Sequence, residues 1–439
     1  MENNFGFPSR IEGFAVRGFK SAAERTEICF RPITFLAGAN SSGKSSVLQP
    51  LLLIKQTLEC QHDPGVMLID GPNVKFAAAQ EFFSTGKSNI HKKDQLELEF
   101  HIEGNFRFLF QYKLIPKKGM ELSSLSIVNG AKQISLDADV KSPELKKRLK
   151  EIYSDSKYFT DFFSGDSTEL RIFKNRCLFE IDMFFKGPEG KEKIRFGELP
   201  ILSAFFEGIK ELIHLPGLRG NPERTYPVSG HGPNFPGDFS SYTASVINYL
   251  EEEKKGDVTR NICKDLETVG LTWKVRARRI KENRVELRVG RLPKGSAGGA
   301  NDLVSIADVG VGVSQTLPVI VALNVARKGQ FVYVEQPEIH LHPRAQFAMA
   351  EILIKAAKRG VRVIVETHSA LLLRGLQYEV SKGEISPKDV GLHWFKRDNT
   401  GKTSVSFSEM DRNGAFGDWP QDFEEVNLKA TQLYLDSIE

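Results

Sequence analysis

A glycine-bounded octapeptide near the start of the chain has the composition of a phosphate-binding loop. Residues 38–45 read GANSSGKS and satisfy the pattern G-x-x-x-x-G-K-[ST]. Glycines let a backbone wrap an anion so that N–H groups face it. Lys44 would reach the β- and γ-phosphates of a nucleotide, and the Ser45 hydroxyl would take one position on Mg²⁺. The residues expected to contact phosphate or the ion are Gly38, Asn40, Ser41, Ser42, Gly43, Lys44, Ser45 and Ser46.

A second set of polar residues follows two apolar runs late in the chain. Residues 331–335 read FVYVE, four β-formers that end in an acid, and 336–343 continue QPEIHLHP. A phosphate loop needs a carboxylate on a neighbouring strand to hold Mg²⁺, so Glu335 is the expected metal ligand beside Ser45. Residues 366–369 read ETHS after the second run. His368 would lie where ligands bind in open α/β sheets and is a candidate sensor of the γ-phosphate.

The elements that must position these residues are visible in the hydrophobic pattern. A β-rich run at 33–37 enters the loop, and a helix from Lys44 to about Cys60 leaves it. Residues 95–137 alternate with a period of two, as in antiparallel sheet. The late runs 331–334 and 361–365 read as strands buried on both faces. Further helices are expected at 144–153, 200–213, 257–269, 317–326 and 345–358, and further strands at 11–16, 27–30, 271–280 and 284–292.

Composition excludes several classes of protein. The 439 residues hold 60 Lys and Arg against 56 Asp and Glu, a net charge of +4 that is too small to indicate a nucleic-acid binder by itself. No apolar run approaches the ~18 residues that a membrane span needs, so no membrane association is expected. The four cysteines never form a C-x-x-C pair, which argues against a zinc site and fits a reducing cytoplasm.

One local stretch is strongly basic. Residues 274–291 carry eight Lys and Arg against two Glu, and on a two-stranded ribbon they would form a positive face suited to phosphate backbones. An exposed sheet kept soluble by its charge explains the same pattern equally well. Arg219 and Arg224, in a loop bounded by glycine and proline, are further candidates for contact with phosphate or a partner. DNA is therefore an expected partner through Lys274 to Arg291, with the solvated sheet as the alternative.

The three chemical motifs, in this order, resemble the ABC-type ATPase head shared by SMC proteins, RecF and the overcoming-lysogenization-defect (OLD) family. The sequences EQPEIHLHP at 335–343, ETHS at 366–369 and LPGLRGNPER at 215–224 are similar to compact bacterial AAA-family ATPases of anti-phage systems, including the Septu ATPase and OLD-like proteins. The resemblance covers residues 1–60 and 300–425 well and the middle poorly. It implies ATP and Mg²⁺ as cofactors, and a nucleotide held between two subunits in a homodimer or a higher even oligomer.

The same resemblance assigns two more features. Residues 308–315 read DVGVGVSQ and are the best match to the signature that faces the partner's nucleotide, with Gly312 and Ser314 as its contacts. In the ABC pattern a second acid after the metal-binding one polarises water. Gln336 stands there instead, and an amide orients water but cannot act as a base. We therefore expect slow hydrolysis, with Glu338 or His368 assisting.

The sequence thus predicts an α/β fold: an ABC-type ATPase head with an antiparallel β-lobe and an α+β insertion. The expected division is 1–135, 136–300 and 301–439. The expected function is the ATPase subunit of a bacterial nucleic-acid-associated complex in the cytoplasm. The complex is expected to act in anti-phage defence, with a separate nuclease or toxin as effector. A nonhydrolysing ATP-dependent scaffold that restrains the effector, and a RecF-like repair ATPase, are the alternatives. The defence role comes from the resemblance alone.

Overall fold

The computed structural model describes residues 10–83, 94–154, 168–186, 193–198, 200–230, 234–295, 302–417, 432–433 and 435–436. The chain divides into two compact units. The first comprises Met1–Phe30, Ser46–Lys210 and Arg397–Ser404, and the second comprises Arg31–Ser45, Glu211–Lys396 and Val405–Glu439. Each unit gathers segments that are far apart in sequence. The division into 1–135, 136–300 and 301–439 stays a prediction.

The first unit is built mainly from antiparallel strands. A six-stranded sheet has the order β2-β1-β4-β5-β6-β7, and a three-stranded sheet has the order β10-β9-β8. The strands are β1 (Ile11–Arg17), β2 (Thr26–Cys29), β4 (Gln95–Ile102), β5 (Phe106–Ile115), β6 (Gly119–Asn129), β7 (Lys132–Leu136), β8 (Thr168–Asn175), β9 (Leu178–Lys186) and β10 (Lys193–Glu198). The helices are α2 (Ser142–Ile152), α4 (Pro200–Lys210) and the 3-10 turn η1 (Ala79–Phe82).

The larger sheet of this unit follows the predicted period of two. Leu96, Leu98, Phe100 and Ile102 are buried on β4, whereas the residues between them are not. The ring of Phe205 on α4 packs against these side chains, with its centroid 4.8 Å from that of Phe100. One face of the sheet is therefore closed by aromatic packing, as expected for an antiparallel sheet with a single buried face.

The second unit contains the mainly parallel sheet. Its order is β11-β16-β17-β3-β18-β19, and the first five strands pair in parallel. The strands are β3 (Ile33–Gly38), β11 (Ile213–Leu215), β16 (Phe331–Glu335), β17 (Arg362–Thr367), β18 (Val390–Arg397) and β19 (Thr403–Ser408). Val332, Val334, Val363 and Val365 have no exposed surface, which confirms strands buried on both faces.

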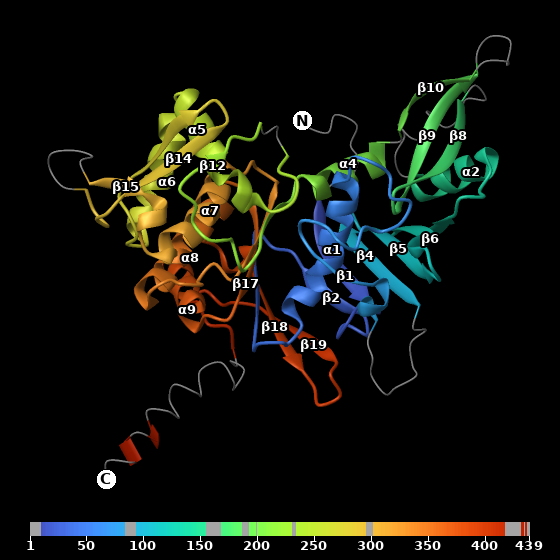
Figure 1. Cartoon of the computed structure of the whole chain (residues 1–439). Helices are drawn as coiled ribbons and strands as arrows, with labels where there is room; N and C mark the ends of the chain where they lie inside the picture. Colours follow the sequence, from blue (N-terminus) through green and yellow to red (C-terminus); the bar gives the residue numbers. More distant parts are fainter. Residues whose placement is uncertain are drawn as a thin grey trace. The chain divides into compact units, whose positions relative to one another are not determined.

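Helices and a second small sheet complete this unit. Helices α7 and α8 pack on the parallel sheet and α9 packs on α8, all drawn in orange in Figure 1. The helices are α5 (Thr243–Glu252), α6 (Gly256–Thr268), α7 (Val311–Val325), α8 (Pro343–Lys358) and α9 (Ala370–Ser381), with 3-10 turns η2 (Phe239–Tyr242), η3 (Ile306–Asp308) and η4 (Pro387–Asp389). The small sheet holds β12 (Tyr226–Pro227), β13 (Val275–Lys281), β14 (Arg284–Gly290) and β15 (Leu303–Ser305).

Most predicted elements are confirmed, including α1 (Lys44–Glu59), which starts at the last two residues of the phosphate loop. The fold class, α/β with an antiparallel lobe and an α+β portion, is confirmed as well. The helix predicted at 200–213 is too long, because Ile213 to Leu215 pair in parallel with β16. The helix predicted at 317–326 begins six residues earlier, at Val311, so the signature residues lie inside α7.

Candidate functional site

The phosphate loop is held open by unusual backbone angles. Gly38 and Gly43 have φ angles of +153° and +102°, and Ser41 has a φ of +61°. A Cβ on Gly38 would come within 2.4 Å of the carbonyl oxygen of Phe395 on β18. Only glycine fits at that position, since the neighbouring strand leaves no room for a side chain. The sequence therefore turns sharply between the end of β3 and the start of α1.

Lys44 is folded back onto its own loop. Its side chain is buried, and Nζ donates to the carbonyl oxygens of Gly38 at 2.9 Å and Ala39 at 2.8 Å. Burial lowers the pKa of Lys44 to about 8. The ammonium is thus bonded to the loop's own carbonyl oxygens, which phosphate oxygens could replace as acceptors.

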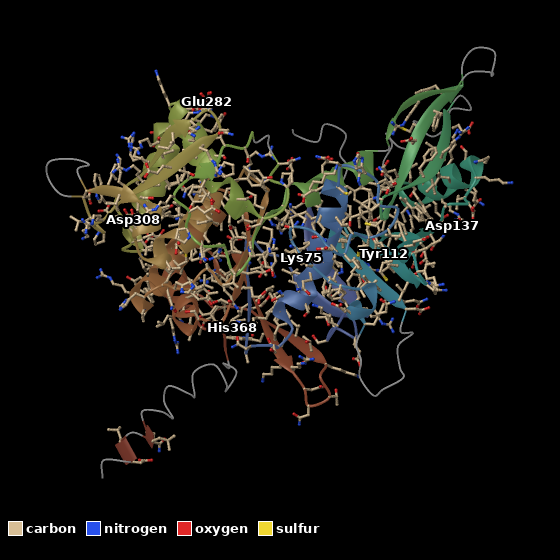
Figure 2. The ribbon with its side chains drawn as sticks, in the orientation of Figure 1. Lys75, Tyr112, Asp137, Glu282, Asp308 and His368 are labelled. Carbon is tan, nitrogen blue, oxygen red and sulfur yellow. The ribbon has the colours of Figure 1, made fainter. Side chains whose placement is uncertain are left out.

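His368 reaches the same loop from the end of β17, where Figure 2 labels it. Its Nδ1 lies 2.8 Å from the Gly38 carbonyl oxygen and 3.4 Å from Lys44 Nζ. A nitrogen that donates to the carbonyl cannot also accept from the ammonium, so Nδ1 carries the proton and Nε2 is the acceptor. Burial and the adjacent Lys44 lower the pKa of His368, which keeps the ring neutral near pH 7.

Two carboxylates stand side by side at the C-terminal edge of the sheet. Glu335 ends β16, and Glu366 lies opposite it in the register of β17. Ser45 donates its hydroxyl proton to Glu366 Oε1 at 2.8 Å, and Tyr333 donates to Glu366 Oε2 at 3.1 Å. Burial and the neighbouring charge of Glu335 raise the pKa of Glu366 to about 7.

Glu335 is held from its other side. His214 Nε2 lies 3.2 Å from Oε1, and the Gly217 backbone N–H donates to Oε2 at 3.2 Å. Burial alone would raise the pKa of Glu335, but these hydrogen bonds outweigh it and the pKa is lowered. Glu335 is therefore the acid of the pair that ionises more readily.

The two residues predicted to act on water lie just beyond β16. Gln336 has a φ of +45°, and its backbone N–H donates to the Glu366 carbonyl oxygen at 2.7 Å. A left-handed non-glycine residue is strained, and such residues cluster at functional sites. Glu338 Oε1 accepts from Thr367 Oγ1 at 2.7 Å and from the His368 N–H at 2.8 Å. The other oxygen, Oε2, is buried without a partner, and burial raises the pKa of Glu338.

The signature residues lie in the first turns of α7. Gly312 is half-buried and its position is tight, because an added Cβ would approach the His340 carbonyl oxygen to 3.0 Å. The Ser314 hydroxyl donates to the Val311 carbonyl oxygen at 2.9 Å. Gly310 precedes the helix and is exposed, as is Val311. Gly310 and Val311 are therefore exposed at this helix start, whereas Ser314 is buried. The start of a helix is a position that suits an anion.

The structure brings most of the predicted residues to one edge of the sheet. Lys44 meets His368, Ser45 meets Glu366, and Glu338 supports the backbone of His368. Asn40 and Ser41 are exposed on the loop, Ser42 is buried beneath it, and Ser46 continues α1. Gly312 and Ser314 belong to α7, whose residue Gln315 is joined to the end of β16 through Arg219.

Two residues of this edge were missed by the sequence reasoning, and a third was given another role. Glu366 is the last residue but one of β17, and His214 lies in the middle of β11. A polar residue near the end of a buried strand is the signal that could have found Glu366. Arg219 was expected to meet phosphate or a partner, but it is buried and bonded within the chain. The partners of Arg219 lie about a hundred positions away in sequence, and nothing local predicts them.

The donor set fits a magnesium-bound nucleotide. Ser45 and Glu335 offer a hydroxyl and a carboxylate oxygen, the hard ligands that Mg²⁺ prefers. The orphaned Glu338 Oε2 leaves an acceptor for a water or a ligand. Within the described residues, no group of three or more His, Cys, Asp and Glu side chains could hold a metal alone. Mg²⁺ commonly takes one or two protein oxygens together with substrate phosphates, and Ser45 with Glu335 would suit that mode of binding.

The basic stretch forms the ribbon β13–β14, but much of its charge is compensated. Three arginines pair with acids: Arg276 with Glu251 at 3.9 Å, Arg278 with Glu286 at 2.9 Å and Arg279 with Glu252 at 2.7 Å. Lys281, Arg284 and Arg291 are exposed. The positive face is thus smaller than the sequence count indicates.

Two parts of the chain are similar to known families of ATPase domains. Residues 10–183 match a family model described as an AAA ATPase domain, and residues 279–374 match one described as "AAA domain, putative AbiEii toxin, Type IV TA system". No curated protein matches the sequence. None of the helices in the described parts of the chain is both long and apolar enough to cross a bilayer.

Solved structures of SMC heads are similar at low identity. An SMC head bound to the C-terminal winged-helix domain of ScpA has 13% identity and a TM-score of 0.49, covering 92% of this chain and 98% of the other. The SMC head of Thermotoga maritima has 12% identity and a TM-score of 0.39, covering 91% and 100%. A head with an extended coiled coil, bound to ScpA, derived from Pyrococcus furiosus, has 12% identity and a TM-score of 0.46, covering 98% and 99%. By the two family models, two parts of the chain are similar to AAA-family ATPase domains.

Proposed function

We propose that the chain binds ATP with Mg²⁺ at the sheet edge formed by residues 38–45, Glu335 and His368. The observation that supports this most directly is a pair of contacts between the loop that follows β3 and the end of the adjacent strand β17: Lys44 with His368, and Ser45 with Glu366. Lys44 would leave its loop carbonyls for the phosphates, and Ser45 with Glu335 would hold the ion. Bound Mg²⁺ would neutralise charge on the triphosphate.

Hydrolysis at this site is proposed to be slow. Gln336 occupies the position of the acid that polarises water, and its amide can only orient a water molecule. His368 Nε2 and Glu338 Oε2 are the nearby acceptors that would assist. ATP would then act chiefly to hold an assembled state together.

The test is phosphate release by the purified full chain, with Lys44→Ala as the control. We expect ATP-dependent release that Lys44→Ala abolishes, at a turnover below the ordinary enzyme median of roughly ten per second. Nucleotide binding is measured in parallel with a fluorescent ATP analogue. Binding without hydrolysis would favour the second candidate, a nonhydrolysing scaffold, for which the neutral Gln336 is the supporting observation.

The proposed assembly is a homodimer or a higher even oligomer, with α7 of one copy facing the nucleotide of the other. Support comes from the exposed start of α7, where Gly310 precedes Val311, an apolar side chain with 45% of its surface exposed. Light scattering with and without ATP tests the assembly. We expect ATP to double the mass of the wild-type chain and to leave Val311→Glu monomeric. Equal masses for the two proteins in ATP would refute this arrangement.

The proposed biological role is the ATPase subunit of an anti-phage complex that acts with a separate nuclease or toxin. The resemblance to anti-phage ATPases supports it, as does the family description that names a putative toxin of a type IV toxin–antitoxin system. Expression with and without the neighbouring reading frame, under phage challenge, tests the role. Protection that needs both genes and an intact Lys44 is expected, whereas a DNA-repair phenotype would favour the RecF-like alternative.

DNA is the proposed nucleic-acid partner, through the exposed basic residues of β13–β14 and its flanks. Lys281, Arg284 and Arg291 are exposed, as are the three arginines that pair with acids. Reversing the charges of Lys281, Arg284 and Arg291 should abolish salt-sensitive binding to duplex DNA and spare ATP binding. Unchanged DNA affinity would leave the solvated sheet as the explanation of this stretch.

A further inference from the structure

Glu366 is a buried carboxylate that contacts the serine of the phosphate loop. Only 3% of its surface is exposed. Its Oε1 accepts the Ser45 hydroxyl proton at 2.8 Å, and its Oε2 accepts the Tyr333 hydroxyl proton at 3.1 Å. Both carboxylate oxygens are thus engaged by hydroxyl groups, which fixes the plane of the carboxylate.

The order of the strands gives Glu366 this place. β17 lies between β16 and the loop strand β3, with Glu366 opposite Leu36 on one side and Glu335 on the other. Glu366 is therefore one strand nearer to the loop than Glu335. The carboxylate of Glu335 is turned to His214 and to the backbone of Gly217. The hydrogen-bonding partner of Ser45 is consequently Glu366.

A hydroxyl that binds a cation does so through an oxygen lone pair. Its proton must then point away from the cation, towards an acceptor, or the hydroxyl rotates and the ligand is lost. In this structure the acceptor is already present, because Ser45 donates to Glu366. A carboxylate in that place also makes the hydroxyl oxygen a stronger ligand of the cation, as carboxylates hydrogen-bonded to other metal ligands do.

We propose that Glu366 is a positioning residue of the divalent-cation site. Its carboxylate accepts a hydrogen bond from the Ser45 hydroxyl and so directs the serine lone pair towards Mg²⁺ or Mn²⁺. Tyr333 acts behind it by holding the second carboxylate oxygen. This inference rests on the proposed function, because it takes Ser45 as a cation ligand. It adds to that function a carboxylate outside the motif that ends β16.

The test measures cation affinity rather than turnover. Mn²⁺ binding to the full chain in the presence of nucleotide is followed by electron paramagnetic resonance, and binding of a fluorescent ATP analogue is followed in EDTA. Glu366→Gln should weaken Mn²⁺ binding about 10–100-fold, the range seen when outer-shell partners of metal ligands are removed. Nucleotide binding in EDTA should be unchanged. Mn²⁺ affinity equal to that of the wild type would overturn the inference.

A double variant separates positioning from direct coordination. If Glu366 acts through Ser45, adding Glu366→Gln to Ser45→Ala should cause little further loss of Mn²⁺ affinity. A full additional loss would overturn the positioning role, since the carboxylate would then act on the cation itself. Tyr333→Phe provides a second measurement that removes only a hydroxyl, and a smaller loss in the same direction is expected. If Glu366→Gln does not fold, unchanged affinity in Tyr333→Phe overturns the inference.

Glu379→Gln is the matched control. Glu379 is also a buried carboxylate of the second unit, on α9, and its ion pair is with Lys382 at 3.5 Å. This variant should keep wild-type Mn²⁺ affinity, and an equal loss in Glu379→Gln would overturn the inference as an effect of any buried acid. Failure of the proposed function is recognised separately, because the wild-type chain would then show no cation-dependent binding of nucleotide at all.

Discussion

Arg219 donates from its guanidinium to the backbone carbonyl of Glu335, the acid that ends β16. The same side chain donates to the carbonyl oxygens of Gln336 at 3.3 Å and Gln315 at 3.1 Å. One buried cation therefore ties the first turns of α7 to the residues expected to hold the ion and the water. Burial lowers the pKa of Arg219 to about 10, so the guanidinium is still charged at neutral pH.

Arg219→Lys should destabilise the protein and slow hydrolysis. An ammonium cannot reproduce a planar fork that bridges three carbonyl groups, so buried acceptors lose their partners. We expect a loss of about 3 kcal/mol in the free energy of unfolding, with a fall in kcat. Chemical denaturation and phosphate release measure the two effects.

Arg224→Lys is the control from the same loop. Arg224 pairs with Asp308 at 2.8 Å, but both side chains are largely exposed. Such pairs contribute about 0–1 kcal/mol, and a lysine keeps most of that. Equal effects of the two substitutions would show that burial of Arg219 has no energetic consequence, contrary to this account.

The local parts of the site were predictable from the sequence, whereas the cross-links were not. The loop at 38–45 lies between β3 and α1 because glycines and a β-rich run are adjacent in sequence. The contact of Ser45 with Glu366 depends on β17 lying next to β3, and no feature of either segment specifies that neighbour. Arg219 looked like a surface residue, because glycine and proline around it predict an exposed turn.

Tertiary pairing also explains the misplaced boundary of one helix. The amphipathic pattern of 200–213 continues past Lys210, yet Ile213 and Leu215 are buried in a strand beside Val332 and Val334. A short apolar run fits either structure, and the edge of a parallel sheet decides it here.

Gln336→Glu should accelerate hydrolysis. The substitution places a carboxylate at residue 336. Glutamate must take the same positive φ there as glutamine, so the backbone strain is unchanged. General-base assistance contributes typically 10²–10⁴-fold, and we expect a rise in kcat of about tenfold or more. Steady-state phosphate release measures it, with Gln336→Ala as the control that lowers the rate. A rate in Gln336→Glu at or below that of the wild type would exclude a water-directing role for residue 336.

Glu99 should make the free energy of unfolding depend on pH in the acid range. Its carboxylate contacts His101 Nε2 at 3.1 Å, Arg25 Nε at 3.0 Å and Arg107 Nη1 at 3.1 Å. The hydrogen bond with His101, followed by those from Arg25, lowers the pKa of Glu99 from 4.5 to about 2. A lowered pKa in the folded state means a contribution that is present above pH 4.5 and is lost as the pH falls towards 2.

Glu99→Gln tests this dependence. At pH 7 the free energy of unfolding of the variant should be lower by about 1–2 kcal/mol. This loss is smaller than the pKa difference alone would give, because solvent screens the half-exposed arginines. The difference from wild type should shrink between pH 4.5 and 2. Glu97→Gln is the control on the same strand. It also removes a carboxylate with an ion-pair partner, since Glu97 lies 3.5 Å from Arg17. A difference that is constant with pH would mean that Glu99 acts through packing and not through its charge.

Gly375 is the close contact between α9 and α8. A Cβ at this position would come within 2.3 Å of the Phe347 carbonyl oxygen and 2.9 Å of Ala350 Cβ. Because the first of these atoms is helix backbone, the two helices must separate to admit a methyl group. Overpacking of this kind costs about 1–3 kcal/mol, which exceeds the gain of about 1 kcal/mol that alanine brings to a helix.

Gly375→Ala should therefore lower the free energy of unfolding, and Gly208→Ala should raise it. Gly208 lies within α4, and a Cβ added there meets no described atom within 4 Å. Gly208→Ala therefore shows the effect of helix propensity alone, which should raise the free energy of unfolding by about 0.5–1 kcal/mol. Urea denaturation of the full chain compares the two variants. If Gly375→Ala proved as stable as Gly208→Ala, the packing of α9 on α8 would have to be looser than the contact with Phe347 requires.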